Sequence, residues 1–280
     1  RSGLPTRTLA DLQPATTCAL IAGLDKVAAA NPGFDLGKTV HNRALPQALA
    51  KGFLWSAPVT GCPGLTMVAG TRVSGANCSI AAELTDAEME GRRQARAIRD
   101  LVRAQVAAGD AVSLAALPAC IGVRETRHAD CLHQLTEGEV LEGARFPDAI
   151  ANGSYRVDVH HSDKAGVTFR YLDGTEVYQA PGVPACCGRW REERAFDPTF
   201  YQIPYRAMVP RGSGNVLAAG RLVDADRGAY GAVRVMVTCN QTGEAAGVAA
   251  ALALRDDGRI AHVDAGQLRG ELARLGALII

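Results

Sequence analysis

The sequence lacks the features that would assign it to several large functional classes. Its 30 Lys and Arg residues nearly balance 29 Asp and Glu residues, for a net charge of +1, and the basic residues stand singly or in pairs. Nucleic acid and anionic membrane surfaces attract a clustered basic face, so neither is expected as a partner. The longest apolar candidate, residues 245–254, is too short for the roughly 20 residues that a membrane span requires.

Several catalytic signatures are also missing. The chain contains no Gly-x-Ser-x-Gly elbow and no complete Gly-x-x-x-x-Gly-Lys-Ser/Thr loop, which argues against a standard hydrolase or nucleoside triphosphatase. The run Gly212-Ser213-Gly214 lacks the third glycine of a dinucleotide fingerprint and precedes a predicted strand instead of following one. We interpret it as a turn.

Cysteine and histidine give no complete metal site. The eight cysteines are irregularly spaced, and the adjacent Cys186 and Cys187 have no second pair. Reduced, structural cysteines are therefore expected, which weakly favours a cytoplasmic protein. Two histidines and a cysteine between residues 128 and 133 match no common zinc spacing. The cluster of His160, His161 and Asp163 leaves three alternatives: metal ligands, groups facing a substrate, or ordinary residues at a strand end.

The remaining pattern predicts a mixture of strands and helices. Residues 15–24, 155–161 and 167–171 have strand character, with a turn at Gly174. A helix is predicted over residues 86–108, with a capping box at Thr85 and Glu88 and a left-handed terminal residue at Gly109. A second capping box is expected at residues 136 and 139.

The last third has the character of a cofactor-binding region. A strand is predicted over residues 215–222, followed by a glycine loop at 227–231, the apolar stretch 233–237 and a small-residue helix from about 241 to 254. A short terminal helix is predicted from Asp264. Glycines at 220 and 231 would let the backbone approach a flat ligand, and residues 238–241 would turn into a helix whose N-terminus stabilises negative charge. Gly243 and Gly247 would let that helix pack tightly on a sheet.

These motifs resemble the C-terminal flavin-contact region of the FAD-dependent oxidoreductases sometimes called xanthan-lyase-like. In that family an Ala-Gly-Arg turn precedes a Gly-Ser-x-Arg-Val-Met-Pro-Thr-Cys run and an alanine-rich helix. This chain departs from the pattern at Asp224, Ala232 and Val237. Upstream, residues 121–127, 146–151, 158–160 and 203–206 also resemble family segments, as do residues 12–17. The matching positions in the C-terminal run are Arg221, Gly231, Arg234, Met236, Thr238, Cys239, Gly243, Ala245, Ala246 and Gly247.

The resemblance implies FAD as the cofactor and an α/β fold. An α+β substrate domain is expected over residues 1–200, followed by the C-terminal segment of a glutathione-reductase-like FAD-binding domain over residues 201–280. The residues implied as cofactor-binding are Gly220, Arg221, Gly231, Arg234, Thr238, Cys239, Asn240, Gln241 and Gly243.

The implied reaction is hydride transfer from a small organic substrate to flavin. Arg124 and Arg127 are candidates to hold an anionic or polyhydroxylated substrate, because guanidinium forks suit carboxylates and hydroxyl clusters. Glu125 is expected to orient one of these arginines. His160 or His161 is the candidate proton acceptor.

The family's Gly-x-Gly-x-x-Gly fingerprint is absent from the sequence. We therefore expect a fragment whose FAD site is completed by a missing N-terminal segment or a partner chain. Two alternatives stay open: a non-catalytic binding or assembly subunit that has lost the flavin site, and a metal-dependent lyase or hydrolase. The composition, rich in Ala, Arg and Gly, suggests a bacterial source.

Overall fold

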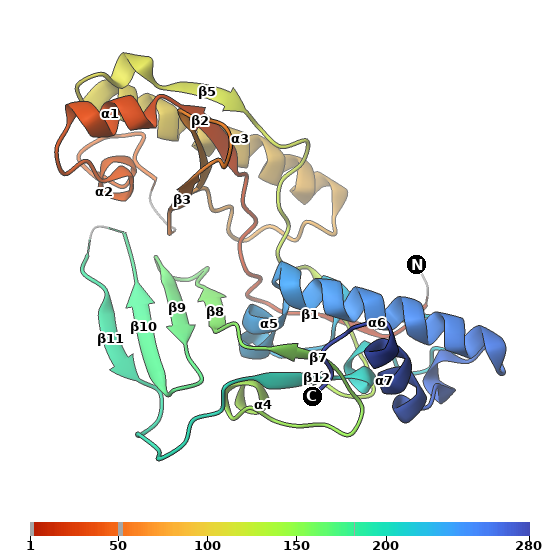
Figure 1. Cartoon of the computed structure of the whole chain (residues 1–280). Coiled ribbons are helices and arrows are strands. Elements are labelled where there is room, and N and C mark those ends of the chain that lie inside the picture. The colour runs from red at the N-terminus through yellow and green to blue at the C-terminus, as the bar shows by residue number, and fades with distance from the viewer. Residues whose placement is uncertain (1–2, 50–52, 182) are drawn as a thin grey trace.

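The structure is a computed structural model that describes residues 3–49, 53–181 and 183–280. Two lobes lie one above the other in Figure 1. The N lobe comprises residues 19–116, and the C lobe comprises residues 3–12 and 127–280. Two crossing segments, residues 13–18 and 117–126, run between them. Helices are combined with sheets in both lobes, as the predicted α/β class requires, and every ladder between the described strands is antiparallel.

The N lobe is a four-stranded sheet with helices packed on it. Its strand order is β3-β4-β2-β5. The apolar core joins Ile21 and Val68 of the sheet to Ile98 of the longest helix. The elements are β2 (Ala19–Ala22), β3 (Trp55–Pro58), β4 (Leu65–Ala69), β5 (Ser113–Ala116), α1 (Leu24–Ala30), α2 (Leu36–Val40), α3 (Ala81–Gln105) and the short 3₁₀ helix η1 (Gly109–Ala111).

In the N lobe the predicted types of the strand and the helix are confirmed, but several of their predicted ends are wrong. Strand β2 is shorter than the predicted 15–24, because residues 15 and 16 form only isolated bridges. Helix α3 begins five residues before the prediction, and its N-cap is Ile80, so the predicted capping box is wrong. The Thr85 hydroxyl instead donates to the carbonyl of Ala81 within the first turn. The left-handed residue after the helix is Ala108, with φ of 58°, and not Gly109.

The C lobe contains a β-meander, two two-stranded ladders and a group of helices around one core. The meander order is β11-β10-β9-β8, and the ladders are β12-β7 and β1-β6. Its strands are β1 (Thr6–Thr8), β6 (Arg127–Ala129), β7 (Ala149–Gly153), β8 (Val157–His160), β9 (Val167–Arg170), β10 (Thr175–Gln179), β11 (Cys186–Arg189) and β12 (Tyr201–Pro204). Its helices are α4 (Glu137–Leu141), α5 (Arg227–Val233), α6 (Met236–Arg255), α7 (Ala265–Arg274) and the 3₁₀ helices η2 (Tyr205–Met208), η3 (Gly220–Leu222) and η4 (Ile260–His262).

Local capping chemistry in the C lobe agrees with the sequence. The box between Thr136 and Glu139 is formed in both directions at α4. Asp264 caps α7 through the backbone N–H of Gln267, and Gly174 has the positive φ, 86°, that its turn requires. The core extends from Leu135 to Leu272 and includes residues on both sides of the predicted domain boundary at 200/201.

The last third differs from the prediction in secondary structure. Residues 215–219 are irregular and lead into η3, so the predicted strand over 215–222 is wrong. The predicted glycine loop is helix α5, and α6 begins at Met236, five residues earlier than expected. Tertiary packing explains why the predicted loop is a helix, because Ala229, Tyr230 and Ala232 are buried in the core.

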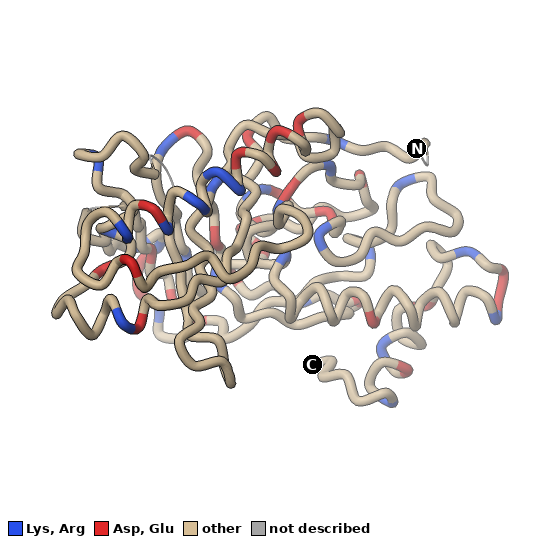
Figure 2. Tube along the Cα trace, turned by 90° about the horizontal axis from the view of Figure 1, so that it is seen from above, with Lys and Arg blue, Asp and Glu red and all other residues tan. Residues whose placement is uncertain are grey.

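The surface is mixed in charge, and one helix face is open. Figure 2 shows basic and acidic residues interspersed along the trace. Along α6, Gly243 and Gly247 are exposed, and a Cβ at either position would meet no described atom within 4 Å. The prediction that these glycines pack on a sheet is therefore wrong for the described part of the chain. Among the described helices, none is long and apolar enough to cross a membrane.

Candidate active site

The two crossing segments form a narrow two-stranded connection between the lobes. Thr16 and Gly122 exchange backbone hydrogen bonds of 3.0 and 2.8 Å, and Ala15 pairs in the same way with Val73 of the N lobe. This pairing places residues 13–16 and 121–124 side by side where the lobes meet. The side chains that follow gather around it.

Two arginines share one hydroxyl at this junction. Arg72, which is only 7% exposed, donates to Thr16 Oγ1 at 3.1 Å and to the carbonyl of Thr71 at 2.6 Å. Arg124 donates from Nη1 to the same Thr16 hydroxyl and to the carbonyl of Pro14. Because one small oxygen accepts from both guanidiniums, the two positive charges lie next to each other.

A third arginine approaches from the C lobe. Arg234, at the end of α5, donates to Gln13 Oε1 and to the carbonyl of Asp158, each at 3.2 Å. Its guanidinium lies 3.5 Å from Asp158 Oδ2. The backbone N–H of His160 donates to Gln13 Oε1 at 3.4 Å. The ring atom Nε2 of His160 lies 3.3 Å from Asp158 Oδ1. Strand β8 therefore carries both members of an acid–imidazole pair into the arginine group.

The electrostatics of this cationic cluster, which we define as Arg72, Arg124, Arg234, Asp158 and His160, are unbalanced. Three guanidiniums face one carboxylate, so two positive charges are uncompensated. Burial lowers the pKa of Arg72 to about 10, and burial together with the two neighbouring arginines lowers the pKa of Arg124. Burial and the same three arginines hold the pKa of His160 far below its usual range, so its imidazole is neutral.

The buried polar atoms without partners in this region are mostly donors. Within the described residues, Arg72 Nε, Arg234 Nε and Gln13 Nε2 have no hydrogen-bond partner. Asp158 Oδ1, which is an acceptor, and His160 Nδ1 are also unpartnered. Leaving the three donors unsatisfied costs about 1–3 kcal/mol each, so the site is set up for a ligand that brings acceptors.

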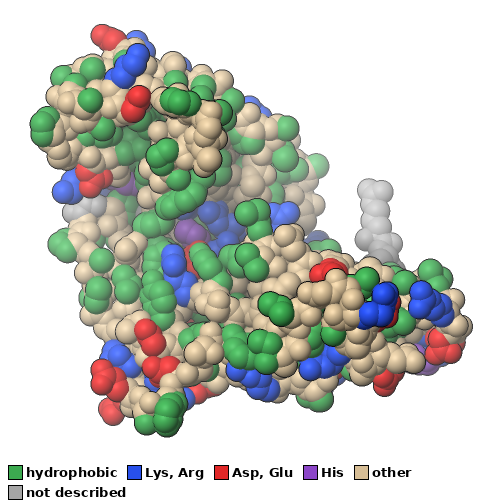
Figure 3. Space-filling view, in the orientation of Figure 1, with side chains coloured by type: hydrophobic (Ala, Val, Ile, Leu, Met, Phe, Trp, Pro, Cys, Tyr) green, Lys and Arg blue, Asp and Glu red, His purple; other side chains and the backbone are tan. Residues whose placement is uncertain are grey.

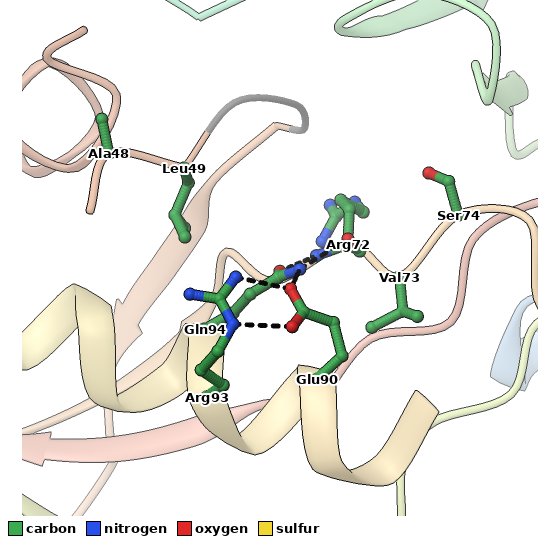
Figure 4. A pocket seen from close by; sticks show the side chains of 8 residues that line it. All are labelled: Ala48, Leu49, Arg72, Val73, Ser74, Glu90, Arg93 and Gln94. Carbon is green, nitrogen blue, oxygen red and sulfur yellow. Dashed lines mark hydrogen bonds and ion pairs between the residues drawn. The ribbon is translucent and has the colours of Figure 1, made fainter. Parts of the chain in front are cut away.

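Space for a ligand lies beside Arg72. Figure 3 shows basic and histidine side chains at the bottom of the hollow between the lobes. A cavity of about 310 Å³ beside Arg72 is lined by Leu49, Arg72 and Ser74, among other N-lobe residues. Figure 4 shows its α3 wall, where Glu90 accepts from Arg93 and from Gln94. Gln94 in turn pairs with both backbone groups of Arg72, at 2.8 and 3.0 Å, and fixes that residue against the helix.

A second cavity opens at the start of α6. It has a volume of about 510 Å³ and is lined by Tyr155, Tyr171 and the first residues of the helix. Met236 and Val237 are 82% and 69% exposed, and the N-cap Val235 supplies no side-chain cap among the described residues. The amide groups of this first turn therefore point toward a largely apolar space, where the helix dipole favours a negative group.

The structure brings together only some of the predicted catalytic residues. Arg124 and His160 belong to the cationic cluster. Arg127 is exposed on β6 and donates to Thr6, away from the cluster. His161 bonds Thr168 at 2.8 Å and lines a separate cavity, because neighbouring residues on a strand point to opposite faces.

Glu125 does not orient an arginine, so that prediction is wrong. Its carboxylate is buried, accepts the backbone N–H of Gln13 at 2.8 Å and lies 2.7 Å from His128 Nε2. The His128 ring packs edge-on against Tyr230, whose hydroxyl donates to the carbonyl of Arg124. Glu125 thus holds the crossing segments in position and acts on Arg124 only through the backbone.

The residues implied as cofactor-binding divide into two groups. Gly220, with φ of 63°, lies against Cys239 where η3 meets α6, and Thr238 is buried in the first turns of that helix. Asn240 and Gly243 are exposed on α6. The others make contacts within the chain: Arg221 donates to the carbonyl of Val123, Gln241 pairs with the backbone of Asn152, and Gly231 packs inside α5 against Asp158.

Two expected features of this region are wrong. Residues 238–241 are not a turn but lie within α6, so the helix N-terminus is at Met236. Gly231 does not open the backbone to a flat ligand, because a Cβ there would lie 2.5 Å from the Asp158 carbonyl oxygen. Its small size is required for packing α5 on β8.

Sequence reasoning missed Arg72 of the cationic cluster. Arg72 stands in a loop-rich stretch with no motif around it, and Gln13 and Thr16 were identified only as part of a family-like segment. The one sequence signal for Arg72 is its place just after an apolar strand, and that signal is weak. Among the described residues, no group of three or more His, Cys, Asp or Glu side chains is placed to hold a metal ion.

Of three comparisons with known proteins, one found a match. A family model described as FAD dependent oxidoreductase matches residues 13–272. The chain belongs to the FAD-dependent oxidoreductase family. The match begins at Gln13, which lies beside the cationic cluster, and runs through α6 into α7. Neither the search of curated proteins nor the search of solved structures found a match.

The cofactor of this family is FAD, and the described residues fit part of it. The uncapped first turn of α6 and the apolar cavity beside it suit an aromatic ring with an electron-rich edge. A pyrophosphate-binding Gly-x-Gly-x-x-Gly loop is not present in the sequence, so these residues do not supply the usual site for the ADP half.

Proposed function

We propose that this FAD-dependent oxidoreductase removes a hydride from a small, anionic or polyhydroxylated organic substrate bound in the hollow between the lobes. The observation that supports the proposal is the cationic cluster, where Arg72 and Arg124 share Thr16 and stand beside a neutral histidine. When bound, FAD supplies the two-electron acceptor. The first turn of α6 and residues 220, 238 and 239 are the candidates to hold its ring.

His160 is the proton acceptor in this proposal. Asp158 Oδ1 lies 3.3 Å from Nε2 of the ring and has no hydrogen-bond partner in the described structure. We propose the tautomer in which Nε2 carries the proton toward this acceptor and Nδ1 presents a lone pair. Nδ1 also has no partner in the described structure. An anionic substrate offsets the arginine charges that lower the pKa of His160, which makes Nδ1 a better base when substrate is present.

We further propose that another polypeptide segment, or a partner chain, provides the ADP-binding half of the site. The open face of α6 supports this, because Gly243 and Gly247 leave room for close approach and Leu254 is exposed at its far end. Small residues on a helix allow another backbone to pack closely.

Flavin titrations of the purified chain test both parts. We expect riboflavin and FAD to bind with similar, weak affinity, because only the ring finds its contacts here; quenching of flavin fluorescence measures both. FAD binding much more tightly than riboflavin would contradict the partner proposal. Failure of both to bind would contradict the placement of the ring at α6.

A pair of variants locates the ring. Val237→Asp adds a carboxylate beside the first turn of α6, and we expect riboflavin affinity to fall about threefold to tenfold. Leu254→Asp adds the same charge at an exposed position near the other end of the helix and serves as the control. Equal effects of the two substitutions would place the ring elsewhere.

A further inference from the structure

The polar environment at the lobe junction narrows the substrate class. The proposed function allows an anionic or a neutral, polyhydroxylated substrate, and the two place different demands on the protein. A polyol presents hydroxyl groups that both donate and accept, so its site needs acceptors as well as donors. A carboxylate only accepts, so its site needs donors and positive charge.

The available groups at the junction are mostly donors. Arg72 Nε, Arg234 Nε and Gln13 Nε2 are buried donors without partners among the described residues. Two nearby acceptors are already used, since Thr16 Oγ1 accepts from two arginines and Gln13 Oε1 accepts from Arg234 and from the backbone N–H of His160. Asp158 Oδ1 and His160 Nδ1 are the acceptors left without a partner in the described structure. A polyol would therefore find few acceptors for its own hydroxyl protons.

Charge leads to the same conclusion. The cluster holds three guanidiniums and one carboxylate, Asp158. Asp158 is itself shared, since it contacts Arg234, His160 and the Tyr155 hydroxyl at 3.2 Å. Arg72 and Arg124 have no carboxylate within ion-pair distance in the described structure, although they lie next to each other. Two adjacent buried cations without an anion are a costly arrangement unless a ligand supplies the negative charge.

We infer that the site takes a small organic carboxylate, held by Arg72 and Arg124 across Thr16. This inference rests on the proposed function for its identity as the substrate, but carboxylate binding itself needs no flavin. The 310 Å³ cavity beside Arg72 has room for a molecule of a few carbon atoms. Its lining combines the apolar Leu49 and Val73, which suit a short apolar segment attached to the carboxylate, with Glu90, whose charge is paired with Arg93.

Calorimetric titration of the unaltered chain with malonate and with malonamide tests the inference. The two molecules have nearly the same shape, but malonamide has no charge. We expect malonate to bind at least tenfold more tightly, with an affinity that falls as NaCl is raised. Equal affinities, or binding of xylitol in preference to malonate, would overturn it. Inorganic phosphate is the third ligand, and its binding more tightly than malonate would replace the carboxylate by a phosphate group.

Substitutions place the binding at the junction. Arg72→Gln and Arg124→Gln should each weaken malonate binding tenfold or more. Arg127→Gln, an exposed arginine three residues from Arg124, should leave it unchanged. Equal loss in all three variants would overturn the assignment. If either buried variant fails to fold, the malonate–malonamide comparison still decides the question. Riboflavin titrations are separate, so lost flavin binding with intact malonate binding refutes the proposed function alone.

Discussion

The two lobes differ in what their longest helix faces. Helix α3 of the N lobe buries its small residues: a Cβ at Gly91 would lie 2.2 Å from Thr17 Oγ1. Helix α6 of the C lobe leaves Gly243 and Gly247 with no described neighbour within 4 Å of a Cβ. Similar small residues therefore serve packing inside the chain in one lobe and remain available in the other.

This difference shows that composition alone does not identify a packed helix face. In α3 the glycine and alanines alternate with Ile98, Leu101 and Val102, which complete a core. In α6 the buried side consists of Thr238, Thr242 and three alanines, and the opposite side is equally rich in small residues. Only the neighbours present in three dimensions distinguish the two sides.

The largest expected effect comes from adding a side chain on the packed face of α3. Gly91→Val should lower the free energy of unfolding by about 3 kcal/mol, because its side chain would overlap Thr17 and Ile121. Urea denaturation of the purified variant measures this. Gly243→Val, the same change on the open face of α6, is the control and should change stability little. Similar losses in both variants would remove the distinction between the helices.

A second effect concerns α5, whose glycine supports the candidate site. Gly231→Ala should cost about 2 kcal/mol of unfolding free energy, because the new Cβ would meet the backbone of Asp158. It should also weaken malonate binding by displacing β8. Urea denaturation and calorimetry together check the prediction. Unchanged malonate binding with lowered stability would show that this packing does not support the site.

Each lobe also buries a histidine whose pKa is lowered, His41 in the N lobe and His160 in the C lobe. Below about pH 6.5 the unfolded state binds a proton that the folded state does not. The free energy of unfolding therefore decreases as the pH is lowered, by up to about 1.4 kcal/mol per pH unit for each histidine. His160→Gln should reduce this acid sensitivity over a wider pH range than His41→Gln, because three arginines add to burial at His160 and only Arg72 does so at His41.

Unfolding free energies measured from pH 7.5 to 5 provide the check. Above pH 6.5 both states carry a neutral His160, so the substitution should not change the pH dependence there. An acid sensitivity that is identical in the two variants would show that the cationic cluster does not control the titration of His160.

The smallest effect is a stabilisation. Gly247→Ala should raise the free energy of unfolding by about 0.5–1 kcal/mol, because alanine is the better helix former and the new Cβ meets open space. Thermal unfolding of the two proteins side by side measures it. A loss of stability would mean that this face of α6 is covered.

Local chemistry made part of the fold predictable. The capping box at residues 136 and 139 and the turn at Gly174 depend on side chains close in sequence, and both are confirmed. The glycine-rich stretch 227–231 was predicted as a loop because glycine disfavours helices. Contacts with β8 and the core, from elsewhere in the chain, make it helical.

The candidate site was less predictable, because its residues come from distant segments. Arg124 and His160 were identified within motifs. Arg72 reaches them only through the pairing of the two crossing segments, which places Thr16 between two arginines that are 52 positions apart in the sequence. No local pattern encodes that meeting, and the mistaken role of Glu125 has the same origin.

The side chain of Gln241 has a consequence for how the protein behaves at high concentration. Its amide accepts the backbone N–H of Asn152 at 3.0 Å and donates to the Asn152 carbonyl at 2.9 Å, as a residue of a neighbouring strand would. Strand β7 pairs with β12 on one side, and this amide occupies backbone groups on the other. An open strand edge invites aggregation by adding strands from other molecules. At Asn152 a single glutamine side chain occupies the backbone groups to which an added strand would otherwise bind.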